Sequence, residues 1–158
     1  MIIIGYQGIG KSTLAGRFNT IDLESGNFWV DGKRADDWYI PYCKIANHLS
    51  EQGYTVFVSS HAVVREELKK SKEKVFVVCP SPELQVPWIE KLEKRYLETK
   101  LEKDYKALKN AEDRYLENIR ELADSGFTWI YIRNMNYSLA DIVVVLEKWC
   151  KEENCKEK

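Results

Sequence analysis

The sequence lacks the patterns that mark several large classes of protein. It contains no apolar run that approaches the roughly 20 residues of a membrane-spanning helix. Its 24 basic and 25 acidic residues give a net charge of -1, so there is no basic surplus for nonspecific contact with nucleic acid. Its four cysteines form no C-x-x-C pair, which favours isolated thiols over a zinc site or a disulfide. These cysteines are Cys43, Cys79, Cys150 and Cys155.

The beginning of the chain lacks a further pattern, the basic segment and small-residue cleavage site of a signal peptide. Together these absences predict a cytoplasmic protein with no membrane partner, and they disfavour nucleic acid as a partner. A length of 158 residues predicts a single domain, 1–158. It leaves the oligomeric state open between monomer and homodimer.

One motif is present in full. The segment Gly5–Thr13 reads GYQGIGKST and matches G-x-x-x-x-G-K-S, between a strand-like run at 2–4 and a helix-like run at 13–18. Its glycines let successive backbone N–H groups wrap an anion. The motif predicts a nucleoside triphosphate site for ATP and Mg²⁺, with Lys11 on the β- and γ-phosphates and the Ser12 hydroxyl on the metal. The nucleotide-binding residues in the loop are Gly8, Ile9, Gly10, Lys11, Ser12 and Thr13.

Short apolar runs alternate with helical patterns along the rest of the chain, which predicts an α/β fold with a parallel sheet. The last predicted helix covers 139–149, with Ser138 as its N-cap, and the charged residues 151–158 are expected to be frayed. The five predicted strands are 2–4, 19–23, 55–59, 74–79 and 127–132, the fourth ended by Pro80 and Pro82.

A long segment rich in Lys and Glu separates the last two predicted strands. Apolar residues recur in it at helical spacing from Trp88 to Leu122, which is too long for one crossover helix. We predict two helices within about 84–123 that meet near 99–104. The sequence leaves open whether they form a solvated charged hairpin or a mobile lid over a bound triphosphate.

Two other nucleotide-binding patterns are missing. No apolar run ends in the aspartate of a Walker B motif, and no N-K-x-D guanine motif is present. The chain is also too short to hold the extra domains of helicases or transporters. These features favour a small kinase among the proteins that carry such a loop.

The arrangement resembles the nucleoside monophosphate kinase fold, including compact phage-type deoxynucleotide kinases and the related shikimate and polynucleotide kinases. Gly5–Thr13 matches the phosphate loop of that family, and this is the only part specific at the level of residues. By order and spacing, 21–25 resembles the acidic segment opposite the loop, 60–65 the turn beside the acceptor, and 79–84 the start of the lid. The resemblance implies a three-layer fold with five parallel strands, flanking helices and a long helical lid.

Candidate catalytic residues follow from the chemistry of phosphoryl transfer, which needs positioning and charge neutralisation. Asp22 is the first choice to orient an acceptor hydroxyl or to serve the magnesium shell, and Glu24 is the second; a turn-capping role for Asp22 stays open. Arg95 resembles the lid arginine that such kinases present to the phosphates, with Arg114 and Arg120 as competitors.

Candidate binding residues for the acceptor are Asp22, Glu24, Arg34 and Arg65. Arg65 follows the third predicted strand, and its guanidinium suits bidentate contact with phosphate. Arg34 lies between Trp29 and Trp38, a combination that suits a base together with a phosphate. Arg133 follows the fifth predicted strand, where the resemblance implies the adenine pocket.

The leading functional hypothesis is transfer of the γ-phosphate of ATP to a nucleoside monophosphate, with a deoxynucleotide as one option. One alternative is a kinase with a hydroxyl acceptor, which would be a nucleoside, a shikimate-like metabolite or a polynucleotide 5′ end. The other is a regulatory ATPase that acts as a switch. His61 ends a predicted strand, and a structural histidine is favoured there over a catalytic base.

Overall fold

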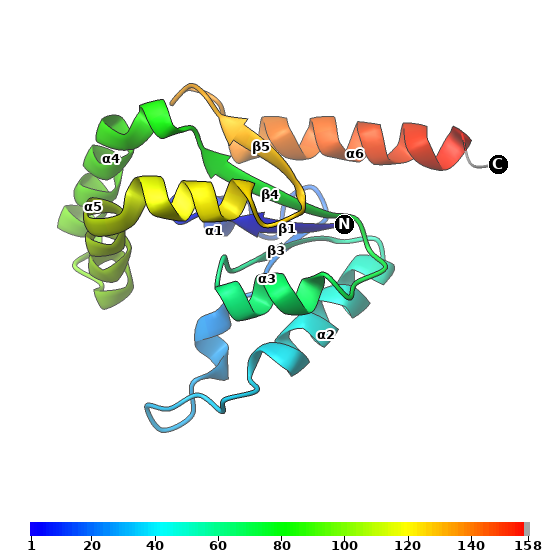
Figure 1. Ribbon diagram of the computed structural model, residues 1–158, viewed down its shortest axis with the longest axis horizontal. Helices are drawn as coiled ribbons and strands as arrows, with labels where there is room; N and C mark the ends of the chain where they lie inside the picture. The colour runs from blue at the N-terminus through cyan, green and yellow to red at the C-terminus, as the bar shows by residue number, and fades with distance from the viewer. Residues whose placement is uncertain (157–158) are drawn as a thin grey trace.

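The structure is a computed structural model that describes the backbone of residues 1–156 and the side chains of residues 1–153. It is an α/β fold built on one all-parallel, five-stranded sheet, which confirms the predicted class (Figure 1). The strand order is β2-β3-β1-β4-β5. The strands are β1 (Ile2–Gly5), β2 (Thr20–Asp22), β3 (Thr55–Val58), β4 (Val75–Pro80) and β5 (Thr128–Ile132).

Helices cover both faces of the sheet, because the crossover from β1 to β2 runs in the opposite direction to the later crossovers toward β5, and right-handed crossovers in opposite directions lie on opposite faces. Helices α1 and α6 contact each other, whereas α2 packs against α3 and β3, and α5 packs against β4. The helices are α1 (Lys11–Leu14), α2 (Tyr39–Glu51), α3 (Ala62–Leu68), α4 (Gln85–Thr99), α5 (Glu102–Ala123) and α6 (Leu139–Lys156). Two short 3₁₀ turns, η1 (Ser25–Phe28) and η2 (Pro82–Leu84), precede α2 and α4.

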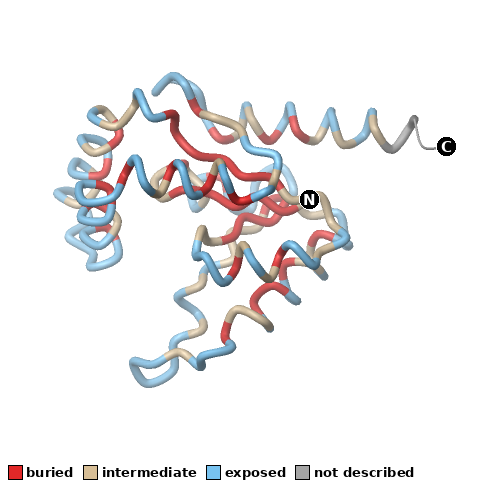
Figure 2. Tube along the Cα trace, in the orientation of Figure 1, coloured by how far each residue is buried: buried red, intermediate tan, exposed pale blue. Residues whose placement is uncertain are grey.

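The central strands form the core. All four residues of β1 and of β3 are buried, and the buried trace in Figure 2 follows these strands and β4. Such unbroken apolar strands are typical of a parallel sheet that is covered on both faces. The loop Gly5–Thr13 therefore follows directly from the buried centre of the sheet.

The helix after this loop is shorter than the sequence predicts. The predicted run 13–18 is wrong, because α1 ends at Leu14 and the chain then turns sharply through Gly16, Phe18 and Asn19, all at positive φ. The Thr20 hydroxyl lies 2.6 Å from both Leu14 O and Arg17 O, and this bonding closes the turn. The turn brings the chain into β2 within a few residues.

Strand β4 includes Pro80, although the sequence pattern ends the strand at residue 79. Val78 O accepts a hydrogen bond from Tyr6 N, so Val78 and Pro80 face the side of β1, while Ser81 N donates to Ile132 O on the side of β5. Strand β1 has already ended at that level. Pro80 is tolerated there because no ladder partner needs its missing N–H.

The two helices predicted within 84–123 are confirmed. Helix α4 ends at Thr99, Lys100 adopts a left-handed conformation with φ 55°, and α5 begins at Glu102. Most of the apolar residues of this hairpin are buried or half-buried against the core, whereas Leu97, Leu101 and Tyr105 near the turn are exposed, as are Val86 and Leu116. The hairpin is thus seated on the domain, and its end projects (Figure 1).

Helix α5 bends at Arg114, whose φ of -139° and ψ of 22° are not helical. The bend brings Asn118 Nδ2 within 3.1 Å of Asn110 Oδ1, eight residues away in the sequence. This contact spans more than two helical turns, so it depends on the bend.

Helix α6 continues to Lys156, beyond the predicted end at residue 149, so most of the segment expected to be frayed is helical. Residues 157 and 158 lie outside the described part of the chain. Ser138 caps this helix as predicted, because its Oγ accepts from Asp141 N and donates to the Asp141 carboxylate. Over the described residues, no helix combines the length and the apolar character needed to cross a bilayer.

Candidate functional site

A cavity of about 1250 Å³ lies at the carboxyl ends of the strands, around the loop Gly5–Thr13. This loop follows the central strand β1, while the segments after β2 and β5 approach the cavity from opposite edges of the sheet. Helices α4 and α5 supply further lining residues. The cavity therefore lies at the place where open parallel sheets bind ligands.

The loop adopts the conformation that its glycines permit. Gly8 has φ 82° and Gly10 has φ 102°, values that residues with a Cβ rarely adopt. A Cβ at Gly8 would lie 2.9 Å from Leu92 Cδ2, whereas a Cβ at Gly10 would meet nothing described within 4 Å. Gly8 is therefore needed for contact with α4, and Gly10 leaves the backbone open to the cavity.

Helix α4 is tied to the loop by polar as well as apolar contacts. The Trp88 indole donates to Gln7 O at 3.0 Å, and Trp88 and Leu92 are both 1% exposed. The Gln7 side chain in turn donates to Ala107 O at 2.8 Å and contacts Asn110 in α5. Both helices of the hairpin are thus positioned directly by the loop.

Lys11 and the two hydroxyl residues that follow it line the cavity. Lys11 Nζ donates to Gly5 O at 3.0 Å, and Ser12 and Thr13 are exposed. Desolvation lowers the pKa of Lys11, and the charges of Asp22 and Glu24 act in the opposite direction. The two carboxylates offset only part of the desolvation of the Lys11 ammonium group. An anionic ligand would therefore stabilise its charged form further.

Asp22 ends β2, and Glu24 follows it in an extended conformation. Both line the cavity. Desolvation raises the pKa of Asp22, Lys11 lowers it, and Glu24 raises it further. The cavity thus holds a pair of carboxylates close to a lysine, as the sequence predicts.

Helices α4 and α5 bring cations to the same cavity. Arg95 lines it and pairs with Asp104, whose Oδ1 lies 2.7 Å from Arg95 Nη2. Lys91 lies one turn before Arg95, with its Nζ 4.2 Å from the centroid of the Trp88 ring. Lys103 also lines the cavity. By contrast, Arg114 is paired with Glu117 and Glu121, and neither Arg114 nor Arg120 is among the described residues that line the cavity. Of the three candidate arginines, Arg95 is the one at the cavity.

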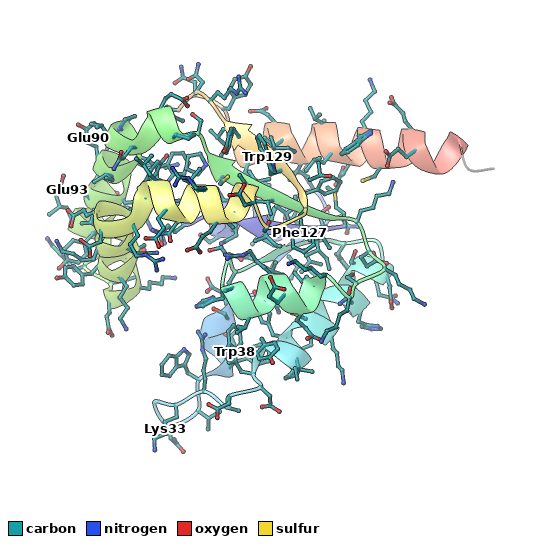
Figure 3. The ribbon with its side chains drawn as sticks, viewed as in Figure 1. Lys33, Trp38, Glu90, Glu93, Phe127 and Trp129 are labelled. Carbon is teal, nitrogen blue, oxygen red and sulfur yellow. The ribbon has the colours of Figure 1, made fainter. Side chains whose placement is uncertain are left out.

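An arm formed by residues 29–38 brings Arg34 to the cavity. A tight turn at Asp31 and Gly32 reverses the arm, and Figure 3 shows Lys33 at its end and Trp38 at its base. The Arg34 guanidinium carbon lies 4.2 Å from the ring centroid of Trp38 and 5.1 Å from that of Trp29. Within the described residues, the buried Arg34 Nε has no hydrogen-bond partner. Arg34 therefore holds an unused donor.

His61 lines the cavity as well, beyond the end of β3. Its Nδ1 lies 2.8 Å from Ser59 Oγ, and its ring packs edge-on to Trp38 with centroids 5.5 Å apart. Desolvation lowers the pKa of His61, as do the charges of Arg34, Lys11 and Arg65. These contacts hold the imidazole beside the cavity and are in keeping with the structural role that the sequence favours.

The structure places two predicted site residues elsewhere. Neither Arg65 nor Arg133 is among the described residues that line the cavity. Arg65 donates to Ser60 O at 2.6 Å and pairs with Glu121 at 3.4 Å. Arg133 is exposed, but the segment 135–140 that follows it does line the cavity.

Sequence reasoning missed other lining residues, including Lys91, Lys103 and Phe18. Lys91 could have been found from its spacing to Arg95, because residues four apart share one face of a helix. By contrast, Glu90 and Glu93, at neighbouring positions of α4, project away from the sheet (Figure 3). Phe18 gave no such signal, because its place depends on the unexpectedly short α1.

The residues present fit a magnesium-bound phosphate group. The exposed Ser12 hydroxyl and the carboxylates of Asp22 and Glu24 border one cavity with Lys11. No cluster of three or more His, Cys, Asp or Glu side chains suited to a metal occurs among the described residues. Mg²⁺ does not need such a cluster, since it commonly uses one or two protein ligands together with phosphate oxygens and water.

Comparison of the chain with models of known protein families gives no matching family, and comparison with curated proteins gives no match. Support for a function therefore comes from the cavity and from the motif that borders it.

Proposed function

We propose that this protein is a phosphotransferase that moves the γ-phosphate of ATP to a nucleoside monophosphate. One observation carries the proposal: the Gly5–Thr13 loop, the carboxylate pair and the cations of α4 and α5 border a single cavity. Phosphoryl transfer needs these three elements, because a loop binds the donor, carboxylates orient the acceptor or metal, and cations offset the transferring charge.

The size of the cavity supports two ligands. Sites for one small molecule usually measure about 300–1,000 Å³. The cavity here measures about 1250 Å³, and its lining extends from the segment after β2 to the segment after β5. A nucleotide donor on the side of β5 leaves the side of Asp22, Arg34 and His61 for the acceptor.

The residues of the chain take distinct roles in this proposal. Lys11 binds the β- and γ-phosphates, and the backbone N–H groups at Gly8–Thr13 cradle them. Arg95 and Lys91 offset charge on the phosphoryl group in transfer. When bound, Mg²⁺ would neutralise charge on the β- and γ-phosphates, held by the Ser12 hydroxyl with Asp22 in its outer shell.

On the acceptor side, the Arg34 guanidinium lines the cavity, with Nη2 donating to Ser25 Oγ at 3.3 Å, and its terminal N–H groups can also donate to a phosphate or carbonyl oxygen of the acceptor. Trp29, which is 52% exposed and lines the cavity, offers an aromatic face for a base. We also propose a cytoplasmic location, in keeping with the reduced thiols of Cys43, Cys79 and Cys150; the Cys155 side chain lies outside the described residues.

A second candidate, a hydroxyl acceptor, is favoured by one specific observation. Arg65, the predicted second ligand for an acceptor phosphate, contacts Ser60 and Glu121 instead. The acceptor side then holds two carboxylates, Asp22 and Glu24, and one arginine, Arg34. A hydroxyl group gains from a nearby carboxylate that orients it, whereas an acceptor phosphate is repelled by it.

The test is an acceptor screen with ATP and Mg²⁺ that measures ADP together with the phosphorylated product. Nucleoside diphosphate formed from one monophosphate supports the first proposal. A phosphorylated nucleoside, polyol or oligonucleotide 5′ end supports the second candidate. Hydrolysis of ATP that no acceptor stimulates would support a regulatory ATPase in place of a kinase. The absence of turnover with every acceptor would count against the proposed function.

A further inference from the structure

The pairing of β2 with β3 is interrupted where the two strands reach the cavity. Thr55 N donates to Asn19 O at 3.0 Å, and Leu23 N donates to Phe57 O at 2.9 Å, which are regular steps of a parallel ladder. In such a ladder the next bond would run from Ser59 N to Leu23 O.

A side chain from α2 occupies that step. Ser59 N donates to the Tyr42 hydroxyl at 2.9 Å, and this hydroxyl donates to Leu23 O at 2.7 Å. One oxygen atom thus replaces a direct backbone bond. Because two hydrogen bonds in series are longer than one, the ends of β2 and β3 are held apart at this point.

The hydroxyl is held firmly in place. Tyr42 is 0% exposed, and its ring packs edge-on to Phe28 and Trp38, with ring centroids 5.4 Å away in each case. Desolvation and the nearby charge of Asp22 raise the pKa of Tyr42, so the group stays protonated and can both donate and accept. Both functions are needed, one toward each strand.

The separated strand ends carry the acceptor side of the cavity. Asp22 and Glu24 flank Leu23 on one strand, and His61 follows Ser59 beyond the other. We propose that Tyr42 is a positioning residue for phosphoryl transfer, whose hydroxyl keeps β2 and β3 apart and so sets the place of the Asp22 and Glu24 carboxylates. This inference rests on the proposed function for its catalytic part, and on the hydrogen bonds alone for its structural part.

The experiment compares Tyr42→Phe with Tyr115→Phe. Tyr115 is also buried, and its hydroxyl donates to a backbone carbonyl, Ser81 O, at 2.9 Å, away from the acceptor side. Each variant loses one buried hydroxyl and keeps its ring. For each we measure kcat for the acceptor found by the screen, the Kd of a non-hydrolysable ATP analogue, and hydrogen exchange at the Leu23 amide.

We expect Tyr42→Phe to lower kcat roughly 10- to 100-fold, since small misplacements of reacting groups have costs of this order. The Kd of the ATP analogue should change less than about threefold, because the Gly5–Thr13 loop is untouched. Exchange at the Leu23 amide should become faster than in Tyr115→Phe. Equal kcat values for the two variants would overturn the catalytic part.

A structural measurement separates this inference from the proposed function. If the wild-type protein phosphorylates no acceptor, the proposed function fails, and exchange at Leu23 still tests the role of Tyr42. Equal exchange in both variants would then overturn it. If Tyr42→Phe does not fold, the wild-type protein supplies the test by NMR. A scalar coupling between Ser59 N and Leu23 C′ would show a direct hydrogen bond and would contradict the inserted hydroxyl. The absence of this coupling supports the inserted hydroxyl.

Discussion

Arg95 and Asp104 form an ion pair across the turn between α4 and α5, with Nη2 and Oδ1 2.7 Å apart. The Asp104 side chain is 2% exposed and also accepts from the Thr99 hydroxyl at 2.5 Å, whereas the Arg95 side chain is 40% exposed. The carboxylate therefore holds the arginine at the cavity and also offsets its charge. A bound triphosphate would have to share Arg95 with Asp104.

Replacement of Asp104 by Asn should tighten ATP binding. The change removes a negative charge from the cavity lining, and one charge near a phosphate is worth on the order of 1 kcal/mol at an intermediate dielectric. We expect a Kd for ATP that is about three- to tenfold lower, measured by calorimetry at low salt. Asp113→Asn, at an exposed position of α5, is the control. A weaker or unchanged affinity in Asp104→Asn would mean that the carboxylate mainly positions Arg95.

Lys11→Met should abolish phosphoryl transfer and yet stabilise the fold. The pKa of Lys11 is lowered in the folded chain, so folding disfavours the charged form of this side chain. The stability of the wild-type protein therefore rises as the pH increases from the lowered pKa of the folded chain toward the ordinary pKa of the unfolded chain. A neutral side chain removes this penalty, and the gain in melting temperature should be largest near pH 7 and vanish above about pH 10.5. Transfer should fall at least about 100-fold. Lys69→Met, at the exposed residue that follows α3, should leave transfer unchanged. Retained transfer in Lys11→Met would remove the loop from the mechanism.

The sequence predicts the parts of the site that depend on local pattern. Gly8, Gly10 and Lys11 follow from one motif, and the sheet follows from apolar runs that are long enough to be buried on both faces. The two helices of the hairpin follow from helical spacing and from a break near residue 100.

Contacts between distant residues decide the rest, and a single sequence does not show them. Arg65 donates to Ser60 O and pairs with Glu121, 56 positions later, and it is not among the described residues that line the cavity. The short α1 depends on Thr20, whose hydroxyl closes a turn that propensity alone does not indicate. Tyr42 carries no motif, and its role exists only because α2 places its hydroxyl between two strands.

Asp22→Asn should depress kcat and change the pH dependence of stability. A carboxyl group whose pKa is raised on folding binds its proton more tightly in the folded chain, so its contribution to stability falls as the pH rises through that range. The pKa of Asp22 is raised even though the nearby charge of Lys11 lowers it. Asp22→Asn should therefore melt at a higher temperature than wild type at pH 7, and the two should converge near pH 4 and below.

The same variant should lose about 10²- to 10⁴-fold in kcat with little change in the Kd for ATP, if Asp22 orients the acceptor. Glu24→Gln is the matched comparison on the same segment. A normal kcat in Asp22→Asn together with a loss in Glu24→Gln would transfer the role to Glu24.

Gly8→Ala tests whether α4 is seated by the loop. Gly8 and Gly53 have similar φ values, 82° and 89°, so alanine meets comparable backbone strain of about 1 kcal/mol at either position. Only at Gly8 would the new Cβ approach Leu92 and Trp88, whereas at Gly53 nothing described lies within 4 Å. The overlap should cost roughly a further 1–3 kcal/mol of unfolding free energy in Gly8→Ala, measured by urea unfolding. Equal losses in Gly8→Ala and Gly53→Ala would show that Leu92 moves aside freely, and α4 could then shift relative to the loop when a nucleotide binds.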